Sequence, residues 1–206
     1  MSLPLYLAST SPRRAELLRQ IGVPFSVLRF PGIDETPMAV EAAPDYVQRM
    51  AREKALAGAA VTPGTSAVAV LGADTSVVLG GDILGKPADA GEAASMLRRL
   101  SGQTHEVLSA VALVCRDEQG RWNDPCTVLS TTRVTFVALG EQDIDAYLAT
   151  GEPFDKAGSY GIQGYGAVLV ASLAGSYSGV VGLPLTETRA LLATAGVPIW
   201  QPPGGP

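Results

Sequence analysis

The chain has 206 residues, of which 47% are hydrophobic and 17% are charged, and it carries a net charge of −5. This composition predicts one folded domain rather than a disordered chain, and the acidic balance argues against non-specific binding to nucleic acid or to anionic membranes. Its apolar runs are shorter than the roughly 18 residues of a membrane span, and no basic segment precedes residues 2–8, so we expect a cytoplasmic protein without a signal peptide.

The first hundred residues alternate between apolar strands and amphipathic helices. Strands are expected over residues 3–8, 25–29 and 67–79, the last followed by a turn at Gly80 and Gly81. The first helix has Ser11 as its candidate N-cap and Pro12 at the favoured first position, and Gly22 stops it. Further helices are expected over residues 45–60 and 90–100. Helical spacing predicts that the following residues of the first of these two face inward: Val47, Met50, Ala51, Ala55 and Leu56.

Strands predominate in the second half of the chain. Residues 104–116 and 127–139 form a predicted strand pair joined by the loop 117–125. A helix capped near Gly140 follows, then two short strands around a turn at 175–179, and a helix over 184–196. This order indicates an α/β chain with a mixed sheet, in which residues 1–198 form one domain and residues 199–206 form a flexible tail.

The residue that most needs an explanation is Asp74, which lies within an apolar strand. A carboxylate there is costly unless it is paired, hydrogen-bonded or bound to a metal. Asp74 either caps a turn through Gly72 or acts as a base or metal ligand. The second interpretation is supported because open α/β sheets gather ligands at the ends of their strands.

The chain has only three lysines, and a glycine-rich segment follows the last of them. Lys86 precedes a proline and, considered alone, is a surface lysine; Lys54 lies on a helix and Lys156 begins the segment "KAGSYGIQGYG". Its four glycines with Gln163 among them form either a tight hairpin or a loop whose backbone approaches a ligand closely.

Histidine and cysteine chemistry is nearly absent. His105 is the only histidine and begins an apolar strand, so we expect it to be structural. Cys115 and Cys126 are too few for a disulfide framework and lack metal-ligand spacing. These counts argue against a Ser-His-Asp or Cys-His hydrolase and against a zinc site.

The remaining candidates for a functional site are carboxylates and cationic side chains. Asp34 and Glu35 are either a solvated acidic turn or, with Asp74, ligands for Mg²⁺ or Mn²⁺, hard ions that commonly bridge to phosphates. Arg13 and Arg14 begin a helix, where cations are unfavourable unless an anion faces them. Together with the lysines, these residues predict a metal-assisted site for phosphate esters or anhydrides.

Seven segments resemble the Maf family of nucleoside triphosphate pyrophosphatases in order and spacing, from about residue 5 to 192. They are "ASTSPRRAELL", "IDETP", "AREKA", "GADTSVVLGGDILGKP", "LSGQTHEV", "DKAGSYGIQGYGA" and "VVGLPLTET". The resemblance implies an elongated mixed β-sheet flanked by helices, with two lobes and a central cleft, as in the inosine triphosphatase fold. It also implies cleavage of a nucleoside triphosphate between the α- and β-phosphates with a divalent metal.

The resemblance implies roles for individual residues. Asp74 corresponds to the proton acceptor that activates water, and with Glu35 it is a candidate metal ligand, while Lys54 and Lys86 line the catalytic cleft beside them. Substrate contact or specificity is implied for Arg13, Thr75, Gln163, Ser9, Ser11 and Arg14.

The segments "GADT" and "GIQG" are similar to the dTTP/UTP pyrophosphatase branch, and the 7-methyl-GTP branch is the nearest alternative, beside a pyrophosphatase for modified purines. A non-catalytic alternative is a nucleotide-binding regulator of septum formation. The expected partner is a small nucleoside triphosphate, without nucleic acid or membrane, and homodimers are common in such families.

Overall fold

The computed structural model describes residues 3–201 and contains a seven-stranded mixed sheet. The sheet has the order β2-β1-β3-β5-β6-β7, and β4 pairs with β3 beside β1. β1 runs parallel to β2 and β3, and the other pairs are antiparallel. The strands are β1 Leu5–Leu7, β2 Ser26–Val27, β3 Val68–Leu79, β4 Asp82–Leu84, β5 Thr104–Arg116, β6 Cys126–Phe136 and β7 Val170–Ala174. The predicted mixed sheet is confirmed.

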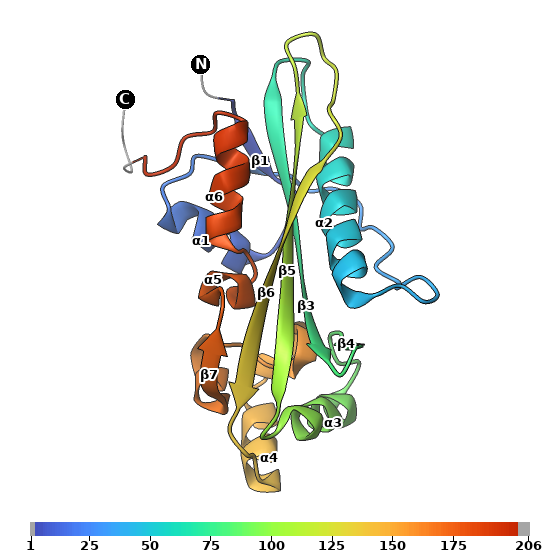
Figure 1. Ribbon diagram of the computed structural model, residues 1–206, viewed down its shortest axis with the longest axis vertical. Helices are drawn as coiled ribbons and strands as arrows, with labels where there is room; N and C mark the ends of the chain where they lie inside the picture. Colours follow the sequence, from blue (N-terminus) through green and yellow to red (C-terminus); the bar gives the residue numbers. More distant parts are fainter. Residues whose placement is uncertain (1–2, 202–206) are drawn as a thin grey trace.

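Helices gather at the two ends of the long strands β3, β5 and β6, which run along most of the molecule (Figure 1). Around one end lie α1 Pro12–Gln20, α2 Ala43–Ala60 and α6 Leu185–Thr194. Around the other lie α3 Ala90–Leu100 and α4 Glu141–Ala149. The remaining elements are α5 Tyr177–Val181 and the 3₁₀ turns η1 Glu152–Asp155, η2 Ala157–Ser159 and η3 Gly164–Leu169. The elongated sheet flanked by helices is thus as predicted.

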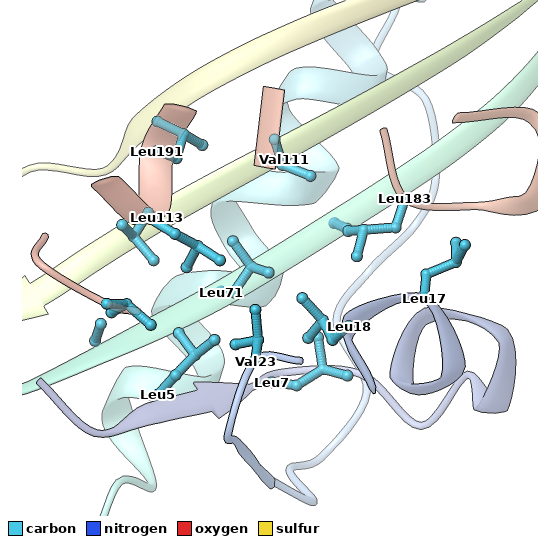
Figure 2. Close-up of a cluster of buried hydrophobic side chains, with 14 of the residues drawn as sticks. Leu5, Leu7, Leu17, Leu18, Val23, Leu71, Val111, Leu113, Leu183 and Leu191 are labelled. Carbon is cyan, nitrogen blue, oxygen red and sulfur yellow. The ribbon is translucent and has the colours of Figure 1, made fainter. Parts of the chain in front are cut away.

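The core is divided among both faces and both ends of the long strands. Leu7, Leu18 and Leu71 pack with α1 and α6 on one face, where Leu183 and Leu191 join them (Figure 2). The other face packs on α2, and the far end holds a third cluster under α3 and α4. Since burying a leucine or valine contributes about 1.5–3 kcal/mol, these clusters fix the helices that carry the polar residues described below.

Helix α2 approaches β3 unusually closely because two positions lack side chains. A Cβ atom on Gly72 would clash with the backbone of Ala51 and Ala55, and one on Gly58 would clash with Ala8 and Val70. The close approach brings Lys54, on α2, against the middle of β3.

Two local predictions were wrong. A turn at 175–179 and a strand after it were expected, but residues 177–181 form α5, because Ser176 Oγ accepts a hydrogen bond from Gly179 N and caps the first turn. Leu56 points outward with 45% of its surface exposed, since small residues of α2 pack on the sheet instead. The predicted N-cap residue of α1, Ser11, is confirmed, although it makes no side-chain capping bond.

Only part of the predicted tail over residues 199–206 can be placed. Trp200 N and Gln201 N donate hydrogen bonds to Ile21 O and Gly22 O, and residues 202–206 lie outside the described residues. The division into a domain over 1–198 and a tail stays a prediction. Within residues 3–201, no helix combines the length and apolar character needed to cross a membrane.

Candidate active site

A gap in the sheet edge creates the main cleft. β1 pairs with residues 69–71 of β3 and β4 pairs with residues 77–79, so residues 72–76 lie between the two partners. The cleft beside this gap has a volume of about 720 Å³. It brings together every site residue predicted from the sequence: Ser9, Ser11, Arg13, Arg14, Glu35, Lys54, Asp74, Thr75, Lys86 and Gln163.

At the centre of the cleft, Lys54 bridges two carboxylates. Its Nζ lies 2.7 Å from Asp74 Oδ1 and 2.7 Å from Glu35 Oε1. Asp74 is only 8% exposed, and its second oxygen has a long contact of 3.5 Å with Ser76 Oγ. The pairing explains how β3 accommodates a buried charge, and it leaves Oδ2 for another partner. Turn capping through Gly72 does not describe Asp74, which lies within β3.

The electrostatics of Glu35 follow from the same bridge. Burial raises the pKa of Glu35, but the hydrogen bond and charge of Lys54, with the more distant Lys86 and Arg14, lower it below its ordinary value of 4.5 overall. Asp34 instead accepts a hydrogen bond from Thr36 N in an exposed turn and does not line the cleft. The two neighbouring carboxylates therefore have different environments.

Tyr46 supports Glu35 from α2 and was not predicted as a site residue. Its hydroxyl donates a 2.8 Å hydrogen bond to the carbonyl oxygen of Glu35. Burial, then the charges of Asp74 and Glu35, raise the pKa of Tyr46 to about 12, so the hydroxyl stays protonated as a donor. A tyrosine on an amphipathic helix resembles a core residue in sequence, which is why the pattern did not reveal it.

Arg14 joins the start of α1 to the end of α5. Its Nε donates to Gly182 O at 3.0 Å and its Nη1 to Ser9 Oγ at 3.2 Å, while Ser11 N donates to the same Ser9 oxygen. Burial lowers the pKa of Arg14; Asp74 opposes this shift and Arg13 adds to it. These hydrogen bonds offset the unfavourable interaction of a cation with the positive end of the helix dipole.

Arg13 points to a different partner. Its Nη1 lies 3.6 Å from Asp155 Oδ2, and Lys156 Nζ lies 2.6 Å from Asp155 Oδ1. Burial raises the pKa of Asp155, but Lys156 and then Arg13 lower it overall. Asp155 was not predicted as a site residue, although it directly precedes the glycine-rich segment.

The remaining predicted residues differ in how firmly they are held. Thr75 Oγ1 lies 3.0 Å from Ser109 Oγ and donates to Gly182 O at 3.4 Å. Lys86 is exposed and forms no ion pair within residues 3–201. Gln163 is also exposed and lies in the loop between η2 and η3.

His105 is structural, as predicted. It is 2% exposed, its Nε2 lies 2.8 Å from Tyr160 Oη, and its ring packs edge-on against Phe136 and Tyr160. Burial lowers the pKa of His105 to about 4, so it is neutral at pH 7. It does not line the cleft, although Tyr160 does.

The chain has close relatives over nearly its whole length. The dTTP/UTP pyrophosphatase of Alcanivorax borkumensis is 61% identical over 199 residues, which are 96% of this chain and 98% of that protein. The dTTP/UTP pyrophosphatase of Salmonella typhimurium is 56% identical, covering 92% of this chain and 91% of its own. The nucleoside-triphosphatase, dITP/XTP pyrophosphatase, of Mycobacterium abscessus has a structure with a TM-score of 0.44 and 18% identity, covering 94% of each chain.

The family comparison covers the residues that form the cleft. The family described as Maf-like protein matches residues 4–195, a range that includes every residue lining the cleft. This match and the identity to the curated relatives agree with the resemblance seen in the seven sequence segments. The chain belongs to the Maf-like protein family.

Proposed function

We propose that this protein hydrolyses dTTP and UTP between the α- and β-phosphates, releasing the nucleoside monophosphate and pyrophosphate. The observation that carries the proposal is a buried carboxylate, Asp74, held by Lys54 at the centre of a cation-rich cleft. The curated relatives named dTTP/UTP pyrophosphatase support the choice of substrate. Such an enzyme would remove nucleotides from the cytoplasmic pool.

The cations of the cleft suit a triphosphate. Arg13, Arg14, Lys54, Lys86 and Lys156 all line it, and anhydride hydrolysis requires that charge on the phosphates be neutralised. Lys86 is free to meet a phosphate directly because it forms no ion pair within the described part of the chain. On binding, Arg13 would leave its ion pair with Asp155 and contact the substrate instead.

In this proposal Asp74 is the proton acceptor. Lys54 holds Oδ1, and Oδ2 retains only the long contact to Ser76 among the described residues. In the proposed step, water attacks the α-phosphorus while Asp74 takes its proton, and the bond between the α-phosphorus and the bridging oxygen breaks so that pyrophosphate leaves. General-base assistance of this kind contributes about 10²- to 10⁴-fold.

A divalent metal, Mg²⁺ or Mn²⁺, is part of the proposal. Within residues 3–201, no group of three or more Asp, Glu, His or Cys side chains converges on one point. Asp74 and Glu35 nevertheless fit such an ion, because Mg²⁺ is usually held by one or two carboxylates with substrate phosphates and water. Bound there, the ion would neutralise charge on the phosphates.

Base recognition is assigned to Gln163 and Thr75 with Arg13. A glutamine side chain has both a donor and an acceptor, which suits the edge of uracil or thymine. Gln163 is exposed at the cleft and is therefore accessible to a base. The competing purine substrates would need a different arrangement at this position.

A pyrophosphate-release assay with dTTP, UTP, 7-methyl-GTP and ITP, each with Mg²⁺ or Mn²⁺, tests the proposal. Pyrophosphate release that favours dTTP and UTP supports it, and preference for 7-methyl-GTP or ITP replaces it with the purine alternative. Nucleotide binding without release would support a non-catalytic regulator of septum formation. A homodimer is a further expectation, which sedimentation of the same sample would measure.

A further inference from the structure

A carboxylate outside the cleft holds the loop that carries Gln163. Glu152 Oε1 accepts hydrogen bonds from Tyr147 Oη and Gly166 N, each 2.9 Å long, and Oε2 accepts one from Tyr165 N at 2.9 Å. Glu152 does not line the cleft. The three donors hold this carboxylate firmly, because each charge-assisted hydrogen bond is about twice as strong as a neutral one.

The contact holds the loop on both sides of Gln163. Tyr147 Oη, while donating to Glu152, accepts a 3.2 Å hydrogen bond from Gly161 N. Gly161 precedes Gln163 by two residues, and Tyr165 and Gly166 follow it. Glu152 and Tyr147 therefore fix the backbone at both ends of the segment 161–166.

The glycines of this segment fit around the same carboxylate. Gly164 has φ +75°, and a Cβ atom there would clash with Glu152 Oε2. A Cβ atom on Gly166 would clash with Gly161 O and Tyr147 Oη. The glycine spacing noted in the sequence thus leaves room for the Glu152 and Tyr147 side chains.

The charge state of the pair suits these bonds. Burial raises the pKa of Glu152, but Gly166 N, Tyr165 N and Tyr147 Oη together lower it overall. Burial first, and then the contact with Glu152, raise the pKa of Tyr147. Glu152 is therefore a charged acceptor and Tyr147 a protonated donor at neutral pH.

Gln163 itself lacks side-chain anchoring. Within the described range, its side chain makes no hydrogen bond to the rest of the protein, not even as a cap of η3. Its position at the cleft must come from the backbone of the loop, which the hydrogen bonds to Glu152 and Tyr147 determine.

We infer that Glu152, through Tyr147 and the backbone of residues 161–166, is a positioning residue that sets the selection of the pyrimidine base by Gln163. The inference rests on the proposed function, because it concerns how that activity discriminates between bases. Glu152 touches neither the phosphates nor the reacting atoms in this account.

The test compares kcat/KM for UTP with that for CTP, which differs from UTP at the edge of the ring. In Glu152→Gln, an amide NH₂ group replaces one carboxylate oxygen and cannot accept a hydrogen bond from the backbone. We therefore expect the ratio of kcat/KM for UTP to that for CTP to fall about tenfold. The fall should arise mainly from KM for UTP. Glu141→Gln, which alters an exposed ion pair with Arg98, is the matched control and should keep the wild-type ratio.

A second background separates positioning from general destabilisation. If Glu152 acts through Gln163, then adding Glu152→Gln to Gln163→Ala should leave the ratio of the Gln163→Ala protein unchanged. A purely structural role would lower kcat/KM for UTP and CTP equally, in wild type and in the Gln163→Ala protein alike. That result would overturn the inference. Should Glu152→Gln unfold below the assay temperature, Tyr147→Phe provides the same comparison.

The outcomes distinguish the inference from the function on which it rests. A wild-type protein that releases pyrophosphate from neither nucleotide contradicts the proposed function. A selective wild type with an equally selective Glu152→Gln variant contradicts the positioning role alone.

Discussion

The ammonium nitrogen of Lys54 lies 2.7 Å from Oδ1 of Asp74, although the two residues are 20 positions apart in the chain. Lys54 comes from α2 and Asp74 from β3, and the contact depends on how closely the helix packs on the strand. Gly72, two residues before Asp74, is one of the two glycines that permit this packing. The chemistry of the cleft and the packing of the core are therefore coupled at one place.

Replacing Gly72 by alanine should damage both stability and activity. The added methyl group would clash with the backbone of Ala51 and Ala55, so the helix must shift and carry Lys54 away from Asp74. Overpacking of this kind costs about 1–3 kcal/mol, which urea unfolding followed by circular dichroism would measure.

Gly85→Ala is the control for this substitution, because a Cβ atom there has no neighbour within 4 Å. Its free energy of unfolding should stay within about 0.5 kcal/mol of wild type. Equal stability of the two variants would contradict the close packing of α2 on β3.

The two arginines of α1 should respond differently to substitution by alanine. Arg14→Ala removes bonds to Gly182 O and Ser9 Oγ, so it should lower turnover and also cost about 1–3 kcal/mol of stability. Arg13→Ala removes a 3.6 Å ion pair with an exposed Asp155, so its cost in stability should be below about 1 kcal/mol while turnover still falls.

Thermal unfolding and pyrophosphate release on the same preparations measure both quantities for the arginines. Wild-type turnover in either variant would remove that arginine from the proposed site. A larger loss of stability in Arg13→Ala than in Arg14→Ala would contradict the hydrogen bonding described for Arg14.

His105 should make stability depend on pH between about 4 and 6.5. Its pKa is lowered from 6.5 to about 4 by burial, so the unfolded chain binds a proton in this window and the folded protein does not. The free energy of unfolding should therefore fall as pH drops from 6.5 to 4, by up to about 3 kcal/mol at about 1.4 kcal/mol per pKa unit. Below pH 4 this contribution changes no further.

His105→Phe isolates that contribution. The variant cannot take up the proton. Between pH 6.5 and 4 its free energy of unfolding should therefore fall by up to about 3 kcal/mol less than that of wild type. Urea unfolding at several pH values measures the difference, and parallel curves for the two proteins would show that His105 does not titrate as described.

The sequence predicted most of the fold because its signals were local. A nearly continuous apolar run and Gly-Gly at 80–81 indicated β3 and the turn after it, and amphipathic segments indicated α2, α3 and α6. The error at α5 arose because the glycines of 175–179 fit a turn and the valines after them fit a strand, whereas the cap from Ser176 starts a helix. The outward position of Leu56 was missed because small residues of α2 pack on the sheet instead, and helical spacing of apolar residues does not reveal which of them do so.

The candidate site could be assembled from the sequence only through chemistry and resemblance. Rare lysines and an unexplained Asp74 identified its centre, and the structure brings these residues into one cleft. Tyr46, Asp155 and Glu152 were missed because their importance lies in contacts across 11 to 142 residues or in loop geometry.

The most direct test of the account compares wild type with Asp74→Asn, using dTTP and either Mg²⁺ or Mn²⁺. Pyrophosphate and dTMP release and calorimetric binding of dTTP are measured on the same preparations, with Asp117→Asn, in an exposed ion pair, as the control. We predict equimolar dTMP and pyrophosphate from wild type and the control, and at least a roughly hundredfold slower release by Asp74→Asn with dTTP binding retained. Release of orthophosphate by wild type, or undiminished turnover in Asp74→Asn, would contradict the account.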